Sequence, residues 1–241
     1  MKIRALRVLV GLALAVAGMY VLYERIEAPQ TQVLGPTLVH GRGHVVALTF
    51  DDGPNPFVTP GVLDTLERER IRATFFVVGR AARAHPALLV RMAADGDEIE
   101  NHTDDHAHLN ALLSQAAIDR EIDDAAAAIV AATGKSPRFL RPPFGARDRA
   151  AIDAARARGY TVVTWSAMLG DAPSGETDAA ATVAGLLPEI HDGAIIVLHD
   201  GDQGRDTRGG RTYEAQAAVT LIHALKTRGY RFLTIAELAR T

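Results

Sequence analysis

The feature that most constrains the fold is an alternation of short apolar runs with longer Ala-rich amphipathic stretches between residues 45 and 233. The apolar runs predict strands at residues 45–50, 73–78, 98–101, 139–141, 161–165, 194–198 and 231–233. The stretches between them carry apolar residues at helical spacing and predict helices at residues 60–69, 86–95, 114–133, 149–158, 179–190 and 213–228. Such alternation predicts a parallel sheet with helices outside it.

The number of strand–helix units narrows the architecture further. About seven units over some 200 residues fit a distorted (β/α)7-type barrel, closed or nearly closed, better than an open doubly wound sheet. Residues 29–43 have no periodicity and read as a linker that contains Pro, Gly, Gln and Thr. No internal repeat interrupts the rest. We therefore predict a single catalytic-sized domain after the linker.

The first 28 residues have a different pattern. Lys2, Arg4 and Arg7 precede an uncharged run at residues 8–23, which is short against the roughly 20 residues that span a bilayer. Basic residues before such a run predict a cytoplasmic N-terminus, a single-pass anchor in the cell membrane and an extracytoplasmic domain. A cleaved signal peptide is the alternative, because residues 15–17 read Ala-Val-Ala, and it would give a secreted or periplasmic protein. A buried core helix is a third interpretation.

Composition excludes several classes of chemistry. The chain has no cysteine, so disulfides, thiolate nucleophiles and Cys-ligated zinc are ruled out. A formal net charge of -3 argues against a nucleic-acid partner, since nucleic-acid binders usually carry a basic surplus.

The first predicted strand ends in two carboxylates, Asp51 and Asp52, followed by Gly53 and Pro54. On a regular strand adjacent side chains point to opposite faces, but a turn at the strand end lets both face one site. Active sites of parallel barrels form at these carboxyl ends. An ordinary acidic turn or a helix cap is the alternative.

The third predicted strand leads into His102 and His106. Four residues apart, they would share one face of a helical turn and could bind one cation. The spacing alone is weak, and two unrelated histidines would also produce it. His108 breaks the spacing and is expected at the surface.

Three further strand ends carry useful groups. Arg141 precedes a stiff Pro-Pro-Phe-Gly turn, Trp165 is followed by Asp171, and the sixth apolar run ends at His199. A lone His after an apolar strand is more often structural than catalytic. Here it is one of five strand ends with chemically useful side chains, which favours a shared site.

Taken together, these residues resemble the NodB-type polysaccharide deacetylases, carbohydrate esterase family 4, over about residues 44–239. The motif regions of that family occur in order as Thr-Phe-Asp-Asp-Gly at 49–53, His-Thr-x-x-His at 102–106, Arg-Pro-Pro-Phe at 141–144 and Leu-His at 198–199. The resemblance implies a family catalytic domain at residues 44–241.

The fourth motif departs from the family pattern of Asp-x-x-Asp-Trp. This chain has Met168 for the first Asp, keeps Asp171 for the second and has Ala172 for the Trp. Val197 also stands where the family commonly has Leu. The missing Trp puts substrate preference in doubt more than the chemistry, and Val197 should still suit an acetyl methyl group.

The resemblance implies a role for each matched residue. Asp52, His102 and His106 would hold a divalent metal, Zn²⁺ before Co²⁺, Ni²⁺ or Mn²⁺. Asp51 would be the general base, oriented by Arg141, while the metal and the Phe144 N–H hold the oxyanion. His199 would protonate the leaving nitrogen, with Asp171 fixing its tautomer. The expected substrate contacts are Pro143, Phe144, Trp165, Val197 and Leu198.

The function that the resemblance implies is removal of N-acetyl groups from N-acetylglucosamine residues of an exported polysaccharide. Peptidoglycan, chitin-like oligomers and other acetylated glycans are all candidate substrates. An O-acetyl (xylan) esterase, or another C–N hydrolase on the same scaffold, is the first alternative. An inactive glycan-binding relative is the second. The presence of His199 favours amide cleavage, because an amide nitrogen must be protonated as it leaves.

Overall fold

The computed structural model describes residues 18, 28–110, 112–170, 179–207 and 212–241. These residues form a parallel sheet with the order β5-β4-β3-β2-β1-β7-β6, and β8 pairs with β1. The strands are β1 Val45–Asp51, β2 Thr74–Val77, β3 Glu98–Asn101, β4 Phe139–Leu140, β5 Thr161–Val162, β6 Ala167–Met168, β7 Ala194–His199 and β8 Arg231–Phe232.

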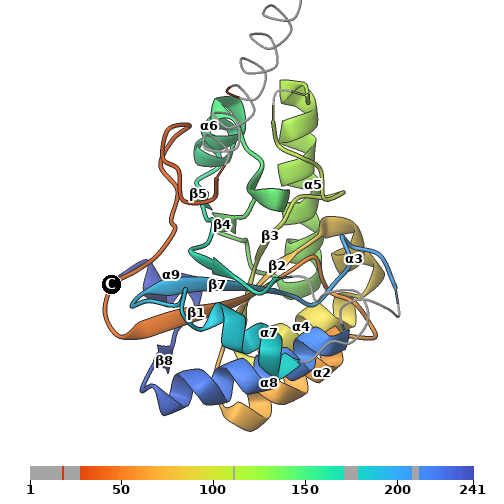
Figure 1. Ribbon diagram of the computed structural model, residues 1–241. Coiled ribbons are helices and arrows are strands. Elements are labelled where there is room, and N and C mark those ends of the chain that lie inside the picture. The colour runs from red at the N-terminus through yellow and green to blue at the C-terminus, as the bar shows by residue number, and fades with distance from the viewer. Residues whose placement is uncertain (1–17, 19–27, 111, 171–178, 208–211) are drawn as a thin grey trace, which may run out of the picture.

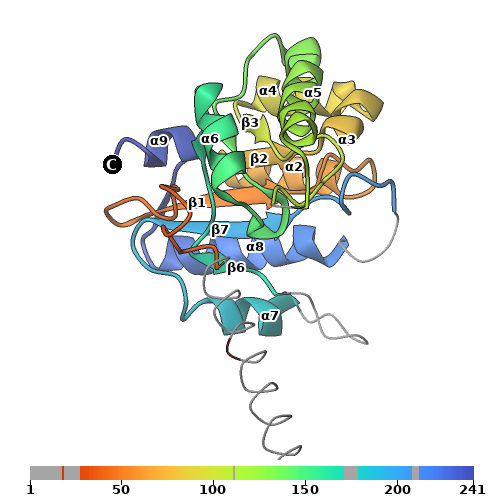
Figure 2. The ribbon, with the colours of Figure 1, turned by 90° about the horizontal axis from the view of Figure 1, so that it is seen from above.

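Helices cover the outer side of this sheet (Figures 1 and 2). The helices are α2 Thr59–Glu69, α3 Gly79–Ala84, α4 Pro86–Asp95, α5 Gln115–Thr133, α6 Arg149–Ala157, α7 Ala179–Leu186, α8 Thr212–Thr227 and α9 Ile235–Leu238, with a 3-10 turn, η1, at Pro143–Gly145. Of these, α9 packs in the cluster of the concave side instead. Neighbours pack in the order α7, α8, α2, α4, α5 and α6, which follows the strand order. The result is a parallel-sheet half-barrel with an outer layer of helices.

The two faces of the strands build two different interiors. On β1, Val46, Leu48 and Phe50 face the helices and join their core, whereas Val45 and Ala47 face the concave side. Burial of both faces explains why β1 reads as a continuous apolar run. The concave side is apolar at the amino end of β1 and polar at its carboxyl end, where the site forms.

The parallel sheet and its crossover helices confirm the predicted architecture, with a half-barrel in place of a nearly closed barrel. The strand path ends at β5 on one side and β6 on the other. Strand β6, two residues long, was not predicted, because so short a strand shows no periodicity. Helix α3 was also absent from the predicted helices.

The N-terminal membrane segment falls on residues 1–28, of which 1–17 and 19–27 lie outside the described residues. Within the described part of the chain, no helix has the length and hydropathy needed to cross a bilayer. The segment at 29–43, expected as a linker, is hydrogen-bonded to the domain. The Leu38 N–H donates to Val162 O at 2.8 Å, and the Gly41 N–H donates to Gly193 O at 2.8 Å.

Candidate active site

Three potential metal ligands converge where β1 and β3 end. One ligand atom from each of Asp52, His102 and His106 lies within 4.8 Å of the others, and all three residues are buried. Asp52 Oδ1 lies 2.8 Å from His106 Nε2 and 3.4 Å from His102 Nε2. One carboxylate and two imidazoles form a donor set suited to Zn²⁺ and similar divalent cations.

The loop backbone, and not a helix, brings the two histidines together. We predicted that His102 and His106 share a helical turn, and this is wrong: both lie in the loop after β3. Thr103 and His106 adopt φ values of +67° and +60°, and Asp52 adopts +75°. Left-handed conformations are costly for residues other than glycine, and they concentrate at functional sites.

The ring of His102 is fixed from behind. Its Nδ1 lies 2.7 Å from the carbonyl oxygen of Arg141, so Nδ1 carries the proton and Nε2 is left to face Asp52. Such a partner sets the tautomer and orientation of a ligating imidazole. The loop that carries Arg141 thus also orients a ligand.

Electrostatics keep the cluster ready to bind a cation. Burial alone would raise the pKa of Asp52. Hydrogen bonds with His102 and His106, together with the charges of those imidazoles, instead hold the pKa of Asp52 well below its usual value. Burial lowers the pKa of His106, which favours the neutral imidazole that metals require. The cluster therefore presents an anionic oxygen, and burial favours the metal-binding form of His106.

The second carboxylate, Asp51, faces a buried cation. Nη1 of Arg141 donates to Asp51 Oδ1 at 2.6 Å and to Thr49 Oγ1 at 2.8 Å. The guanidinium carbon lies 4.0 Å from the centre of the Phe76 ring, and burial lowers the pKa of Arg141. Arg141 is fully buried. Asp51 is thus held in a fixed orientation beside the cluster of potential metal ligands without joining it.

These groups line an open pocket of about 270 Å³. Its lining residues are Asp51, Asp52, His102, His106, Phe144, Trp165, Met168, Leu169, Val197, His199 and Gln203. Phe144, whose φ is +59°, is half-exposed at the rim. Its ring stacks on the exposed His108 at 4.2 Å between centroids. His108 lies at the surface as expected, but its stacking on Phe144 was not foreseen.

Some predicted contacts lie elsewhere. Leu198 is buried in the core that faces the helices, because it alternates with Val197 and His199 along β7. Pro143 is buried in η1 and is not among the lining residues. Asp171 and Ala172 lie outside the described residues.

One residue near the pocket had no signal in the motifs. Glu214, in the first turn of α8, is fully buried, and its carboxylate accepts the His199 backbone N–H at 2.9 Å. A first-turn Glu is an ordinary helix feature, so only the packing of α8 against β7 reveals it.

The comparisons with known proteins agree with this geometry. Residues 39–163 match the family model described as polysaccharide deacetylase. A chitooligosaccharide deacetylase of Bradyrhizobium sp. (strain ANU 289) is 37% identical over 199 residues, which cover 80% of this chain and 90% of that protein.

Two solved structures extend the similarity to the fold. The Bc1960 peptidoglycan N-acetylglucosamine deacetylase aligns with a TM-score of 0.76 and 28% identity, over 85% of this chain and 93% of that one. A family 4 acetyl xylan esterase from Clostridium thermocellum, in complex with a cobalt ion, aligns with a TM-score of 0.72 and 32% identity, over 81% and 90%. The chain therefore belongs to the polysaccharide deacetylase family, whose members are hydrolases.

Proposed function

We propose that this protein removes N-acetyl groups from N-acetylglucosamine residues of an extracytoplasmic glycan and releases acetate. The observation that carries the proposal is the oriented Asp51–Arg141 pair directly beside the Asp52, His102 and His106 cluster. A base that does not join the potential metal ligands is what metal-assisted amide hydrolysis requires. The names of the relatives support the same bond and the same sugar.

The residues fit a divalent cation. Their donor atoms lie close together, the Asp52 carboxylate has a strongly lowered pKa, and His102 is oriented by a backbone carbonyl. When bound, the cation supplies polarisation of the acetyl carbonyl and lowers the pKa of water from 15.7 to about 7. We favour Zn²⁺, and Co²⁺, Ni²⁺ or Mn²⁺ suit the same ligands.

Different side chains of the pocket then act as the base and as the acid. Asp51 accepts the proton of the attacking water, and Arg141 keeps its carboxylate oriented. The Phe144 N–H donates to the oxygen that becomes negative in the transition state. His199, which lines the same pocket, gives a proton to the departing nitrogen. General acid and base groups each contribute roughly 10²–10⁴ in rate.

The cellular site is part of the proposal. The basic residues before the apolar run at residues 8–23 support a membrane anchor, or an export signal, with the catalytic domain outside the cytoplasm. Chitin-like oligomers and peptidoglycan are both compatible substrates, because each presents N-acetylglucosamine.

A second candidate is O-deacetylation of xylan. The observation that favours it is the 32% identity to the acetyl xylan esterase, together with Met168 at the rim where the family has Asp. His199 in the pocket favours the amide, since an alcohol leaves with less need for an acid.

The test measures acetate released by the full chain, purified in detergent and loaded with Zn²⁺ or Co²⁺. N-acetylchitooligosaccharides, peptidoglycan and acetylated xylan are presented in parallel, with Asp51→Asn as the blank. We expect acetate from an N-acetylated substrate, abolished by the substitution and by a chelator. Acetate from xylan alone would replace the proposal with the esterase. No acetate from any substrate, with metal bound, would reject both.

A further inference from the structure

The buried carboxylate of Glu214 lies behind His199, the proposed acid. Glu214 Oε1 lies 3.4 Å from His199 Nδ1, and Glu214 Oε2 accepts the His199 backbone N–H at 2.9 Å. Glu214 is fully buried, whereas the His199 side chain is 16% exposed and lines the pocket. The carboxylate therefore contacts His199 at two points from the side away from the substrate.

The position of Glu214 follows from the packing of two elements. His199 is the last residue of β7 and pairs in register with Asp51 on β1, so acid and base stand at the ends of neighbouring strands. Helix α8 packs against β7 and places its first turn beside this strand end. The Glu214 side chain thus comes from a helix that has no residue among those lining the pocket.

This contact bears on which ring nitrogen of His199 carries a proton. An ionised carboxylate only accepts hydrogen bonds, so it favours the tautomer with the proton on Nδ1. Nε2 is then the nitrogen left for the pocket. When Nε2 takes up a proton, the resulting imidazolium gains a nearby negative charge in a site of low dielectric.

We propose that Glu214 is a positioning residue that fixes the tautomer of His199 and stabilises its protonated form for transfer to the leaving group. Its effect on catalysis rests on the proposed function, whereas its effect on the tautomer does not. A purely structural role is the competing explanation, since the same carboxylate accepts a backbone N–H at 2.9 Å.

Glu214→Gln separates the two roles. The Gln side-chain oxygen can still accept the His199 N–H, so a structural role survives the change. The Gln NH₂ group, however, donates toward Nδ1 and favours the opposite tautomer, with the proton on Nε2 and no stabilising charge. Asp171→Asn is measured alongside, because sequence comparison points to Asp171 for the same task. His199→Ala is the matched control.

The first readout is the tautomer, measured in the full chain with ¹⁵N-labelled histidine and assigned by the signal lost in His199→Ala. We expect Nδ1–H in the wild type and Nε2–H in Glu214→Gln. An Nε2–H tautomer in the wild type would overturn the proposal even if the variant does not fold. The proposal would also be overturned if the tautomer of His199 changed in Asp171→Asn but not in Glu214→Gln.

The second readout compares two leaving groups. An N-acetylchitooligosaccharide needs a proton on its nitrogen, whereas 4-nitrophenyl acetate releases a stable phenolate without one. Glu214→Gln should lower kcat/KM for the amide by about 10–100-fold, the range found when the partner that orients a metal-bound imidazole is removed. The ester rate should stay near the wild-type value, and adding Glu214→Gln to His199→Ala should cost nothing more.

The outcomes separate the two proposals. Parallel loss on amide and ester would show a structural role and overturn the assignment of Glu214. An unchanged amide rate in Glu214→Gln would do the same. If the wild type hydrolyses the ester but no N-acetylated glycan, the proposed function fails, and the tautomer measurement still decides the role of Glu214.

Discussion

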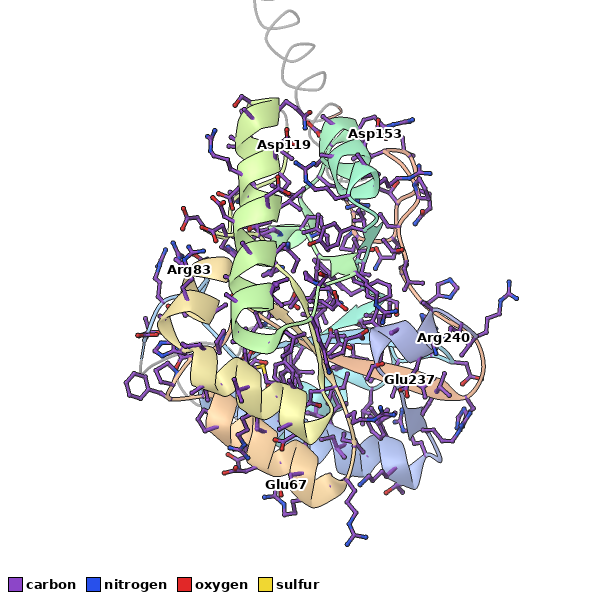
Figure 3. The ribbon with its side chains drawn as sticks, turned by 180° about the vertical axis from the view of Figure 1, so that it is seen from behind. Glu67, Arg83, Asp119, Asp153, Glu237 and Arg240 are labelled. Carbon is purple, nitrogen blue, oxygen red and sulfur yellow. The ribbon has the colours of Figure 1, made fainter. Side chains whose placement is uncertain are left out.

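Two polar pockets lie at opposite ends of the same sheet, and only one of the two combines the groups expected of an active site. The pocket at the carboxyl ends of the strands has about 270 Å³ and holds Asp51, Asp52 and the imidazoles. The pocket at the amino ends is larger, about 340 Å³, and is lined by Asp97, Glu98 and Glu100 among basic side chains. Glu237 and Arg240, labelled in Figure 3, lie at its edge.

The carboxylates of the two pockets have different partners. At the amino ends, Asp97 accepts the Ala73 N–H at 2.8 Å, and Glu100 accepts the N–H groups of Arg138 and Phe139 at 2.6 and 2.8 Å. These carboxylates fasten the beginnings of the strands to one another. At the carboxyl ends, the partners are two imidazoles, which can bind a metal or carry a proton, and a guanidinium, which orients Asp51.

Perturbed pKa values therefore do not identify the functional pocket here. Burial raises the pKa of Asp97 to about 7 and that of Glu100 to about 8, although neither faces a potential metal ligand. Structural carboxylates are perturbed by burial just as catalytic ones are. What distinguishes the carboxyl-end pocket is the convergence of different chemical groups, and each prediction below tests that distinction.

The largest effect is expected from the metal ligand. Asp52→Asn keeps the size of the side chain, and Asn tolerates the left-handed φ of +75° at this position. It removes the anionic donor, so metal binding and hydrolysis should both be lost, by more than the roughly 10²–10⁴-fold expected for a base alone. Metal content by mass spectrometry and acetate release check this. A variant with full metal content would show that Asp52 is not a ligand.

The general base should have the next largest effect, and one of a different kind. Asp51→Asn should lower kcat by about 10²–10⁴-fold with the metal retained. It should also destabilise the fold, because the buried Arg141 loses its charged partner. Thermal unfolding and metal content, measured with activity, separate the two consequences. Loss of metal in this variant would contradict the division of roles between Asp51 and Asp52.

The sequence was informative where the site depends on neighbours along the chain. Asp51 and Asp52 share one strand end, and His102 and His106 one loop, so their convergence could be predicted. The loop conformation could not, because left-handed φ values at Thr103 and His106 carry no residue signal.

Other parts of the site depend on contacts between distant segments. Glu214 reaches His199 only because α8 begins beside the end of β7, which no local pattern encodes. By contrast, the prediction that Leu198 lies in the pocket could have been avoided. Strand alternation puts Leu198 and His199 on opposite faces, so both could not face the substrate. The parallel sheet could be predicted because its strands are buried on both faces and therefore appear as continuous apolar runs in the sequence.

A smaller effect is expected at the rim of the carboxyl-end pocket. Phe144→Gly keeps the backbone N–H, and glycine readily adopts a φ of +59°. Only the ring is lost, with its contacts to His106 and His108 at 4.8 and 4.2 Å between centroids. Phe144 lines the pocket, and we expect its ring to contact the substrate. If that contact is worth about 0.5–1.5 kcal/mol, KM should rise by about 2–10-fold with little change in kcat. A large fall in kcat would assign the ring to the chemistry.

The smallest effect on activity is expected at the amino-end pocket. Glu100→Gln should leave hydrolysis and metal content at wild-type levels, because Glu100 faces strand beginnings and not the metal cluster. Its effect should be on the pH dependence of stability. Burial raises the folded-state pKa of Glu100 from its ordinary 4.5 to about 8, so the folded state holds a proton that the unfolded state releases.

The stability contributed by that proton is complete below pH 4.5 and is lost as the pH rises through about 8. Gln is neutral throughout and can still accept an N–H from Arg138 or Phe139, so the variant should lose less unfolding free energy than the wild type between pH 5 and 8. Urea unfolding across this range measures the slope. An equal slope in both proteins would mean that Glu100 is ionised in the fold. A loss of acetate release in Glu100→Gln would mean instead that the amino-end pocket contributes to catalysis. The distinction between a structural pocket at one end of the sheet and a catalytic pocket at the other would then be wrong.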